Sequence, residues 1–456
     1  MSMYSRSQLF NTPATHGYSL MSALDSTWST FTEAVVGTGW RALHPIARAK
    51  ILDVLGKIKV GKITVLTKEK TYNFGVLDAD LRATLDVKSD AFWVRVGLFT
   101  DMGLAEAFMF GDVDCEDVSS LIQILIANRR ELTAVDTLLV AKGRTLTSSK
   151  FIESLTNSRA NISAHYDFGN TMFSAFLSED MNYSSAVFLD YNEDLDPTVS
   201  VCESLEEAQM RKLRLILKKG NIQPGQRVLE IGTGWGSLAI LAAKTFNCTV
   251  DTITLSSNQA ELARQRIADA KLSDQIKVHC MDFRECRKNP EWAGSFDRFI
   301  SVEMIEHVGK DFFEGYWAVA DWALNPETGV GVVQGITIPE SRVRGYDENG
   351  ADFVQKWSWS FNTLRGLLTN PTLVFPGGYL PSFSLIVKTL NQGSGGRLVM
   401  DSVLNIGPHY ARTLREWKRR FLANCDGVVA KVLREEYDLD EQGLEVFRRK
   451  WIFVVV

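Results

Sequence analysis

The sequence predicts an α/β fold with a mostly parallel sheet flanked by helices, preceded by a smaller N-terminal α+β domain. Three observations support this prediction. Beyond residue 203, short apolar runs alternate with helical segments, as in chains that build βαβ units. One of these runs, Val228–Ile231, leads through a glycine-rich turn into a helix. The chain of 456 residues is long enough for about two to three domains.

The bulk composition restricts the class of protein. Apolar residues make up 45% and charged residues 23% of the chain, as in ordinary soluble proteins. The net charge of -5 gives no reason to expect a nucleic-acid partner. The six cysteines lack C-x-x-C spacing, which predicts a reducing, cytoplasmic compartment without disulfides or structural zinc. Because no signal peptide and no apolar run of about 18 residues is found, we expect no membrane-spanning segment.

The first part of the chain divides into a tail, a small domain and a linker. Residues 1–40 are rich in Ser and Thr and are predicted to be disordered, residues 41–135 to form the α+β domain, and residues 136–160 to form a polar linker. In the small domain, apolar periodicity predicts helices at Ile51–Ile58, Leu104–Gly111 and Ser119–Asn128, and strands at Lys62–Thr67 and Phe92–Leu98.

The larger domain is predicted to span residues 161–456 and to carry the parallel sheet. Its first helix follows Glu203. The expected strands are Val228–Ile231, Thr249–Leu255, Ile276–Cys280 and Phe296–Val302, with helices at Ser237–Thr245 and Asn258–Ala270. Gly329–Ile338 is a further apolar run. In such a sheet a ligand binds at the carboxyl ends of the strands.

The turn after the first of these strands has the pattern of a nucleotide-cofactor site. Gly232, Gly234 and Gly236 carry no side chains that would hold a ligand away from the backbone. Glu230, near the end of the strand, is placed to accept hydrogen bonds from sugar hydroxyls. The spacing G-x-G-x-G is shorter than the dinucleotide pattern, which favours S-adenosyl-L-methionine as the cofactor. A plain strand–helix turn is the competing interpretation, since glycine turns are common.

Three further strand ends carry groups suited to a ligand. Thr254 and Gln259 follow the second strand, and Asp282 with Phe283 follows the third, where they are suited to an adenine amino group and its ring. After the fourth strand, Ser301–Gly309 holds two carboxylates and a histidine. Acids are also common at the start of an ordinary solvated helix. Suitable groups at four successive strand ends nevertheless favour a binding site.

Two segments upstream of the sheet, 165–173 and 181–188, are dense in aromatic residues. A core-packing helix is the common role of such a stripe. The alternative is a lid that covers both cofactor and substrate.

Taken together, these segments resemble the cyclopropane-fatty-acyl-phospholipid synthase family, which includes the mycolic acid cyclopropane synthases. The resemblance runs from about Ala47 to Trp451. It rests on HYDFGN (165–170), MNYSSAVF (181–188), VLEIGTGWGSLA (228–239), TLSSNQ (254–259), FDRFISVEMIEHVG (296–309), FPGGYLPS (375–382) and IGPHYARTLREW (406–417).

The resemblance implies a Rossmann-like class I methyltransferase domain and, in residues 41–135, a lipid-binding-like domain. It implies methyl transfer from S-adenosyl-L-methionine to the alkene of an unsaturated phospholipid acyl chain, followed by proton removal and closure of a cyclopropane ring. A bound bicarbonate is the implied base. Because the lipid lies in a bilayer, peripheral membrane contact is expected, and the resemblance also suggests a homodimer.

Residue roles follow from the same resemblance. Glu306 and the backbone around Ser185 and Ile336 would hold the bicarbonate, with Gln334 in place of a family histidine. With Glu230 and Gly236 added from the glycine turn, the expected cofactor site comprises Tyr183, Ser184, Glu230, Gly232, Gly234, Gly236, Thr254, Gln259, Asp282 and Phe283.

The chain departs from the family pattern at several positions. Thr233 and Ser185 stand where cysteines are usual, and Gln334 replaces the histidine; its amide can still donate a hydrogen bond, so the site would be altered but kept. Most of residues 357–374 is inserted where the site's tyrosine is expected, and we hypothesise a retained intron there. The sequence stops at Trp451–Val456, where the resemblance predicts a final strand.

These departures leave two alternatives open. One is a C-methyltransferase that acts on a sphingolipid, a branched fatty chain or a secondary metabolite. The other is a catalytically impaired protein that only binds lipid or cofactor. Without the final strand a sheet edge would be unpaired, so we also expect lower stability than in longer relatives.

Overall fold

The computed structural model describes residues 44–133, 169–348, 379–437 and 439–455. The predicted disordered tail, the predicted linker and the inserted stretch within 357–374 lie outside these ranges, so the expectations for them remain predictions.

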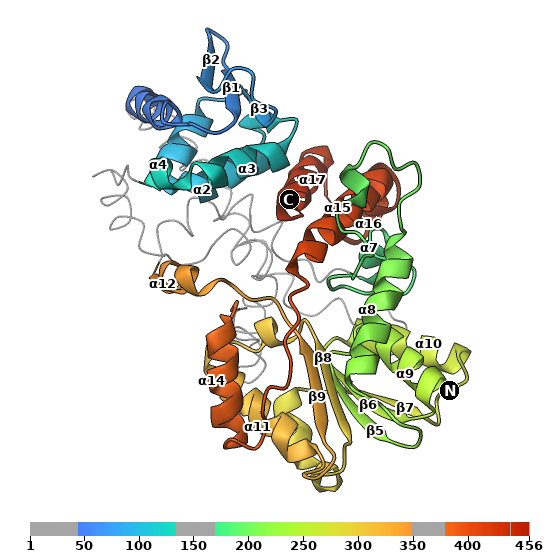
Figure 1. Ribbon diagram of the computed structural model, residues 1–456. Coiled ribbons are helices and arrows are strands. Elements are labelled where there is room, and N and C mark those ends of the chain that lie inside the picture. The colour runs from blue at the N-terminus through green and yellow to red at the C-terminus, as the bar shows by residue number, and fades with distance from the viewer. Residues whose placement is uncertain (1–43, 134–168, 349–378, 438, 456) are drawn as a thin grey trace, which may run out of the picture. The chain divides into compact units, whose positions relative to one another are not determined.

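The chain divides into two compact units, both shown in Figure 1. The first comprises the chain up to His165 together with Glu441–Phe453, and the second comprises Tyr166–Asp440. None of the helices in the described ranges is both long enough and apolar enough to cross a membrane.

The first unit is built on a four-stranded mixed sheet in the order β2-β1-β3-β4. Strands β1 and β3 run parallel, while β2 pairs antiparallel with β1, and β4 with β3. In β1 only Ile63 and Val65 are fully buried, which is the alternation expected of a sheet with one buried face. The strand predicted at Lys62–Thr67 is thereby confirmed; the others were not predicted. The bounds are β1 (Lys62–Leu66), β2 (Thr71–Gly75), β3 (Arg82–Val87) and β4 (Val113–Cys115).

Helices pack beside this sheet at residues 44–55, in α3 (Val118–Ala127) and in α4 (Arg129–Thr133). The first two confirm the helices expected around Ile51 and Ser119. Helix α3 begins after Asp117, whose carboxylate accepts a hydrogen bond from the Ser120 N–H at 3.0 Å. This N-cap satisfies a backbone donor that would otherwise lack a partner.

The strand expected at Phe92–Leu98 is wrong, because the segment is the first part of helix α2 (Ala91–Met109). A short apolar run fits a buried strand and a buried helix equally well, so periodicity alone did not separate them. The helical form buries Phe92, Trp93 and Val94 in succession.

Helix α2 also contains the helix expected at Leu104–Gly111, beyond a kink. The kink lies at Thr100, whose φ of 52° is in the left-handed region. The chain turns so closely there that a Cβ on Gly103 would lie 2.0 Å from the Arg95 carbonyl oxygen. Only glycine fits at that position.

Helix α17 (Glu441–Val454) packs with the first unit although it lies near the C-terminus. The ring of Phe453 lies 6.3 Å from that of Phe108, centroid to centroid. Arg449 pairs with Asp114 at 2.7 Å and donates to the Phe108 carbonyl at 3.3 Å. The predicted larger domain included this helix, which instead completes the core of the first unit.

The second unit contains five parallel strands in the order β7-β6-β5-β8-β9. The chain lays down β5, β6 and β7 outward and then returns to place β8 beside β5. The crevice at such a reversal, at the carboxyl ends of the strands, is where open parallel sheets bind ligands. The four expected strands are confirmed, at β5 (Arg227–Ile231), β6 (Thr249–Thr254), β7 (Ile276–Cys280) and β8 (Arg298–Val302). The apolar run at Gly329–Ile338 contains the fifth strand, β9 (Val330–Gln334).

Helices cover both faces of this sheet (Figure 1). Successive residues of one strand enter opposite cores, since Val228 packs with α8 and α9 while Leu229 packs with α11. Burial on both faces favours apolar residues, which is why such strands are rich in them, although Glu230, Asp251 and Arg298 are also buried here. One face carries α8 (Leu205–Lys219), α9 (Ser237–Phe246) and α10 (Ser257–Asp269), and the other carries α11 (Phe313–Ala323) and α14 (Phe383–Ser394).

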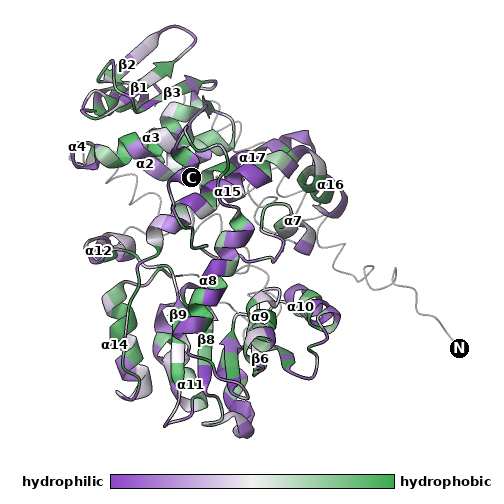
Figure 2. Ribbon diagram, turned by 45° about the vertical axis from the view of Figure 1, so that its right-hand side comes forward, coloured by the Kyte–Doolittle hydropathy of each residue, from purple (hydrophilic) through white to green (hydrophobic). Residues whose placement is uncertain are grey.

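Helix α8 shows how local sequence sets an element. The Ser204 hydroxyl accepts a hydrogen bond from the Glu207 N–H, and the Glu207 carboxylate accepts one from the Ser204 N–H. This capping box satisfies two donors at the start of the helix. Polar and apolar stretches alternate along α8 in Figure 2, and Leu213, Ile216 and Leu217 carry its apolar side into the core.

The other described helices of the second unit are shorter or follow the sheet in the sequence. They are α7 (Asn170–Ser174), α12 (Glu340–Glu348), α15 (Gly407–Asn424) and α16 (Ala430–Tyr437), with a π-helical turn at Cys425–Val429.

Candidate functional site

The glycine turn after β5 leaves its backbone open. Gly232, Gly234 and Gly236 have φ angles of 103°, 52° and 85°, which residues with a Cβ rarely adopt. The N–H groups of Gly232 and Thr233 donate to the Ile253 carbonyl at 2.9 and 3.0 Å and so fix the turn on β6. A Cβ on Gly234 would meet no atom within 4 Å. The residues present therefore fit a cofactor that lies against this turn.

Glu230 is buried beneath the turn. Its carboxylate accepts a hydrogen bond from the Thr252 hydroxyl at 2.6 Å, and the same hydroxyl lies 2.8 Å from Thr233 Oγ1. Burial raises the pKa of Glu230 to about 8, against the opposing effects of Thr252 and of the nearby Lys212 ammonium. Glu230 thus supports the turn from inside, and its expected contact with sugar hydroxyls stays a prediction.

Thr254 and Gln259 meet at the end of β6. The Thr254 hydroxyl donates to Gln259 Oε1 at 2.8 Å, and Ser256 caps α10 by accepting from the Gln259 N–H at 3.2 Å. The two predicted cofactor contacts therefore form one hydrogen-bonded pair, held in place by the start of the helix.

Asp282 and Phe283 follow β7, where both already have partners. The two Asp282 carboxylate oxygens accept from the Arg284 guanidinium at 2.9 and 2.6 Å. Phe283 is buried and packs edge-on against Tyr316, with 5.6 Å between ring centroids. An adenine amino group would therefore share Asp282 with Arg284. Arg284 lies two positions after Asp282 in the chain, but no sequence pattern indicates that the two side chains pair.

The segment from Tyr183 to Ser185 is held against α8. Gln209 Nε2 donates to the Ser184 carbonyl at 2.8 Å, and Lys212 Nζ donates to the Ser184 hydroxyl at 2.8 Å. Lys212 is only 1% exposed. Burial lowers its pKa to about 8, while the carboxylates of Glu303, Asp180 and Glu230 act in the opposite direction.

The same segment is tied to the glycine turn. The Asp180 carbonyl accepts hydrogen bonds from the Ser237 hydroxyl and, at 3.1 Å, from Arg266. Arg266 also donates to the Trp235 carbonyl at 2.9 Å. Helix α10 thereby joins the turn and the upstream segment into one rigid support.

Glu303 stands directly after β8 and reaches across to this segment. Its Oε1 accepts from the Ser185 N–H and from Gln334 Nε2, each at 2.8 Å. Its φ of 47° is again in the left-handed region. Burial raises the pKa of Glu303, whereas the two hydrogen bonds and the Lys212 charge oppose that rise. Sequence reasoning noted two carboxylates here but gave a role only to Glu306.

Glu306 is the second of these carboxyl groups. Its Oε1 accepts from the Ile336 N–H at 2.8 Å, and its buried Oε2 has no hydrogen-bond partner in the described part of the chain. Burial and, secondarily, the charge of Glu303 raise the pKa of Glu306 to about 8. The structure thus brings Ser185, Glu306, Gln334 and Ile336 together, and adds Glu303 among them.

Aromatic rings crowd beside these groups. Tyr183 stacks on Trp417 of α15 at 5.1 Å and meets Phe173 edge-on at 5.3 Å, measured between ring centroids. Phe173 in turn packs against Trp235 of the glycine turn at 5.1 Å. The aromatic stripe is therefore partly core and partly a wall of the site.

Two residues of α15 belong to this wall although no role was predicted for them. Trp417 carries the stacked ring, and Tyr410 lies near Glu303 and Glu306, whose charges add to the effect of burial in raising its pKa. Both lie in the motif IGPHYARTLREW, and this motif is the sequence feature from which their place at the site could have been predicted.

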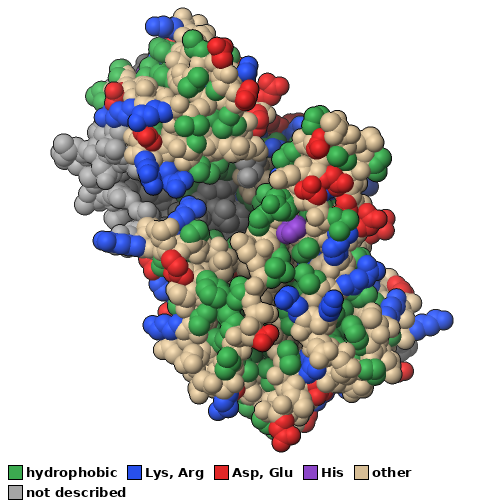
Figure 3. All heavy atoms as spheres, in the orientation of Figure 1, with side chains coloured by type: hydrophobic (Ala, Val, Ile, Leu, Met, Phe, Trp, Pro, Cys, Tyr) green, Lys and Arg blue, Asp and Glu red, His purple; other side chains and the backbone are tan. Residues whose placement is uncertain are grey.

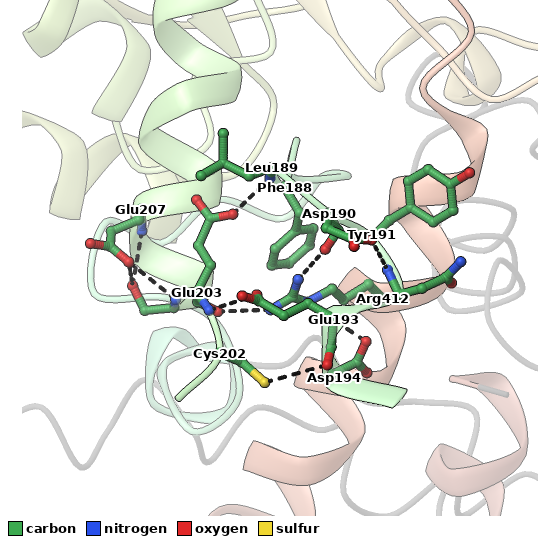
Figure 4. A network of polar contacts seen from close by, with 12 residues as sticks. Phe188, Leu189, Asp190, Tyr191, Glu193, Asp194, Cys202, Glu203, Glu207 and Arg412 are labelled. Atoms are coloured by element: carbon green, nitrogen blue, oxygen red, sulfur yellow. Dashed lines mark hydrogen bonds and ion pairs between the residues drawn. The ribbon is translucent and has the colours of Figure 1, made fainter. Parts of the chain in front are cut away.

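Arg412, also on α15, binds residues 188–203, which follow the Tyr183–Ser185 segment in the chain (Figure 4). The buried guanidinium donates to the backbone carbonyls of Asp190 and, at 3.0 Å, Glu203, and pairs with the Glu193 carboxylate at 3.0 Å. It also lies 4.2 Å from the centre of the Phe188 ring. The network fixes the path of residues 188–203 between the site and α8.

Comparison with known proteins identifies related sequences. The family model described as mycolic acid cyclopropane synthetase matches residues 153–451. Tuberculostearic acid methyltransferase of Mycobacterium tuberculosis is 33% identical over 365 residues, which is 80% of this chain and 76% of that protein. Cyclopropane-fatty-acyl-phospholipid synthase of Escherichia coli is 31% identical over 353 residues, or 76% of this chain and 78% of that protein.

A solved structure supports the predicted fold class. Coclaurine N-methyltransferase, bound to N-methylheliamine and SAH, superposes with a TM-score of 0.51 at 20% identity, over 77% of this chain and 92% of that one. At this identity the likeness concerns the fold alone, and it confirms the Rossmann-like methyltransferase architecture.

The family model covers more than half of the chain, and both relatives exceed 30% identity over three-quarters of it or more. The chain therefore belongs to the cyclopropane-fatty-acyl-phospholipid and mycolic acid cyclopropane synthase family of S-adenosylmethionine-dependent lipid methyltransferases.

Proposed function

We propose that this enzyme transfers the methyl group of S-adenosyl-L-methionine to the alkene of an unsaturated phospholipid acyl chain and closes a cyclopropane ring. The observation that carries the proposal is the pair of carboxyl groups of Glu303 and Glu306 beside the rings of Tyr183 and Tyr410. Methyl transfer to an alkene requires a cofactor site, a surface that stabilises a cation and a proton acceptor. Groups suited to each task adjoin one another here.

The cofactor supplies a methyl group on a positively charged sulfur. The open backbone at Gly234 supports its place against the glycine turn. The residues proposed to hold it are Tyr183, Ser184, Glu230, Gly232, Gly234, Gly236, Thr254, Gln259, Asp282 and Phe283.

The protein and the lipid perform the remaining steps. An alkene is a weak nucleophile, so its alignment and the exclusion of water must supply much of the rate. The electron pair of the alkene forms the new carbon–carbon bond and leaves a cation on the adjoining carbon, which the half-exposed ring of Tyr183, backed by the buried Trp417, would stabilise. Removal of a proton from the new methyl group then lets the electrons of that C–H bond close the ring.

The proposed proton acceptor lies among Ser185, Glu306, Gln334 and Ile336, which the hydrogen bonds between these residues support. Two kinds of base are compatible with this place. One is a bound bicarbonate, which the resemblance to the family suggested. The other is a carboxylate of the chain itself.

A second candidate function is methylation of a lipid chain without ring closure. One relative is named as a methyltransferase of tuberculostearic acid and the other as a cyclopropane synthase, at nearly the same identity to this chain. In simple methylation the proton would leave a neighbouring chain carbon, so a double bond would remain. The two reactions share the site and differ only in which proton the base takes.

We propose further that the first unit contacts the lipid surface. Val60, Val76 and Leu77 are 50%, 51% and 66% exposed, and the loops that carry them meet where the Val76 N–H donates to the Gly61 carbonyl at 2.9 Å. Figure 3 shows hydrophobic side chains among charged ones on the drawn face of this unit. Exposed apolar side chains of this kind bury into the boundary between headgroups and acyl chains.

Vesicle flotation tests this contact. Leu77→Asp is expected to weaken flotation with vesicles that contain anionic phospholipid, whereas Val201→Asp, at a residue of the second unit that is 82% exposed, is expected to leave it unchanged. Equal losses in both variants would contradict the assignment to the first unit.

The proposal also includes a cytoplasmic location and a homodimer. Fractionation of cells that express the chain would test the first, and light scattering after gel filtration would test the second. Recovery of the protein outside the cytoplasm would contradict the proposed location. A measured mass equal to that of a monomer would contradict the proposed homodimer.

Mass spectrometry of lipids tests the proposed reaction. Purified enzyme is incubated with S-adenosyl-L-methionine and vesicles of a monounsaturated phospholipid. A gain of one CH₂ with loss of the double bond supports ring formation, and the same gain with a retained double bond supports methylation alone. No gain would support the impaired protein instead.

A further inference from the structure

The carboxylate of Glu303 occupies the place expected for an external base. Its Oε1 accepts from the Ser185 N–H and from the Gln334 amide at 2.8 Å each. The Ile336 N–H, the third donor expected to hold an anion, is bound by Glu306 Oε1 at 2.8 Å. Two carboxyl groups of the chain therefore use the donors that a bicarbonate would need.

The backbone at Glu303 directs the side chain to this place. Its N–H donates to the Gln334 carbonyl at 2.7 Å, which continues the pairing of β8 with β9 for one more residue. Its φ of 47° is unfavourable for a residue with a Cβ. Such conformations persist where the surrounding structure determines them and are concentrated at functional sites. A glycine would adopt the same φ without strain, and without a carboxylate.

We propose that Glu303 is the catalytic base of this enzyme, and that the reaction therefore needs no bicarbonate. The inference rests on the proposed function and names the base of that same site. Among the described residues no donor is bonded to Glu303 Oε2, which leaves this oxygen to accept the proton.

The step balances without any further reactant. Glu303 Oε2 takes a proton from the new methyl group of the lipid cation, and the electron pair of that C–H bond closes the ring. If the proton comes from the neighbouring chain carbon, the pair forms a double bond instead. Glu303 becomes a neutral carboxylic acid and returns the proton to water after the product leaves.

Burial raises the pKa of Glu303, and the hydrogen bonds from Ser185 and Gln334 oppose that rise. The buried ammonium of Lys212 favours the carboxylate form of Glu303. Burial and, secondarily, the charge of Glu303 raise the pKa of Glu306 to about 8, and its buried Oε2 accepts no hydrogen bond in the described part of the chain.

Activity in carbonate-free buffer tests the proposal. Wild-type activity is expected to be the same with and without added bicarbonate. Glu303→Gln is expected to lose about 100-fold or more in kcat, the usual contribution of a general base. Glu303→Gly is expected to be equally slow, but to recover at least about tenfold with bicarbonate, because Ser185 and Gln334 are freed. The exposed Glu291→Gln serves as a matched control with unchanged activity.

A binding measurement gives a second readout. Carbon-13 NMR of labelled bicarbonate is expected to show binding to Glu303→Gly and none to the wild type, while calorimetry shows equal affinity of all variants for SAH. If Glu303→Gly does not fold, the change in kcat of Glu303→Gln still tests the proposal. A wild type that requires bicarbonate or binds it at this site, or a fully active Glu303→Gln, would overturn the proposal. A wild type that methylates no lipid would instead overturn the proposed function, and the NMR result would stand by itself.

Discussion

The ammonium of Lys212 donates a hydrogen bond to the Ser184 hydroxyl over 2.8 Å in the interior of the second unit. Through this bond, helix α8 supports the segment that carries Tyr183 and Ser185. The same charge acts on the carboxylates of Glu303, Asp180 and Glu230. The buried Lys212 ammonium therefore stabilises the fold of the unit and also favours the ionised forms of the carboxyl groups at the site.

Lys212→Met is expected to lower the free energy of unfolding by about 3–5 kcal/mol, because it leaves buried carboxylates without their cation. Lys219→Met, at an exposed position of the same helix, is expected to change it by less than about 0.5 kcal/mol. Urea unfolding of the two variants measures the difference, and equal losses would show that the buried charge is not what matters.

Gly234→Ala is expected to reduce the affinity for SAH at least tenfold while it destabilises the fold by only about 1 kcal/mol. The new methyl group would enter the open space against the turn, where no atom lies within 4 Å of it. Gly225→Ala is a matched control, since Gly225 also has a positive φ and open surroundings but lies in the turn before β5. Isothermal calorimetry should separate the two variants; a similar loss of affinity in both would rule out a specific cofactor contact at Gly234.

Arg412→Met is expected to cost about 3–5 kcal/mol of unfolding free energy, because Glu193 and the carbonyls of Asp190 and Glu203 lose a buried partner. Arg419→Met, on the exposed side of α15, should cost less than about 0.5 kcal/mol. Thermal and urea unfolding would measure both. A neutral Arg412→Met would mean that the network does not hold residues 188–203 in place.

The stability of the second unit is expected to fall as pH rises from about 5 to 8. The pKa of Glu230 and of Glu306 is about 8 in the folded protein, against an ordinary value of 4.5. Between these values the folded state binds more protons than the unfolded state, so a rise in pH favours unfolding. Each pKa unit corresponds to about 1.4 kcal/mol for each group, so two groups over three pH units give an upper limit of about 8 kcal/mol.

Urea unfolding at pH 5 and pH 8 checks this dependence. Glu230→Gln removes one of the two groups and is expected to flatten the profile, while Glu291→Gln, at an exposed position, should leave it unchanged. An unaltered slope in Glu230→Gln would contradict the raised pKa of Glu230.

The parallel sheet could be predicted because its signals are local. Apolar runs buried on both faces and the glycine turn recur at the spacing of βαβ units, and no distant contact is needed to recognise them. The prediction of a strand at Phe92–Leu98 was wrong because it used only local signals. A short apolar run fits a strand or a helix, and the tertiary packing of Phe92 and Trp93 decides between them. Strands β2 and β4 were missed because they are short and polar on one side.

The sequence predicted which of the site residues lie together better than it predicted their arrangement, and their functional roles remain predictions. Ser185, Glu306, Gln334 and Ile336 meet as the resemblance implied. The direction of the Glu303 side chain depends on one φ angle and on two partners, Ser185 and Gln334, which lie 118 and 31 positions away in the chain. No sequence pattern indicates such distant contacts. Lys212 lies on the same buried stripe of α8 as Ala208 and Ile216, so its spacing was a signal of burial, but lysine is a residue type that is rarely buried.

The return of α17 to the first unit has a consequence for how the protein is made. Arg449 and Phe108 meet across 341 positions of the chain. At about 5–20 residues per second, the ribosome delivers these partners tens of seconds apart. During that interval the first unit is a discontinuous domain with an unfinished core, open to chaperones and proteases. Its survival in the cell therefore depends on a helix that is translated long after the rest of the unit.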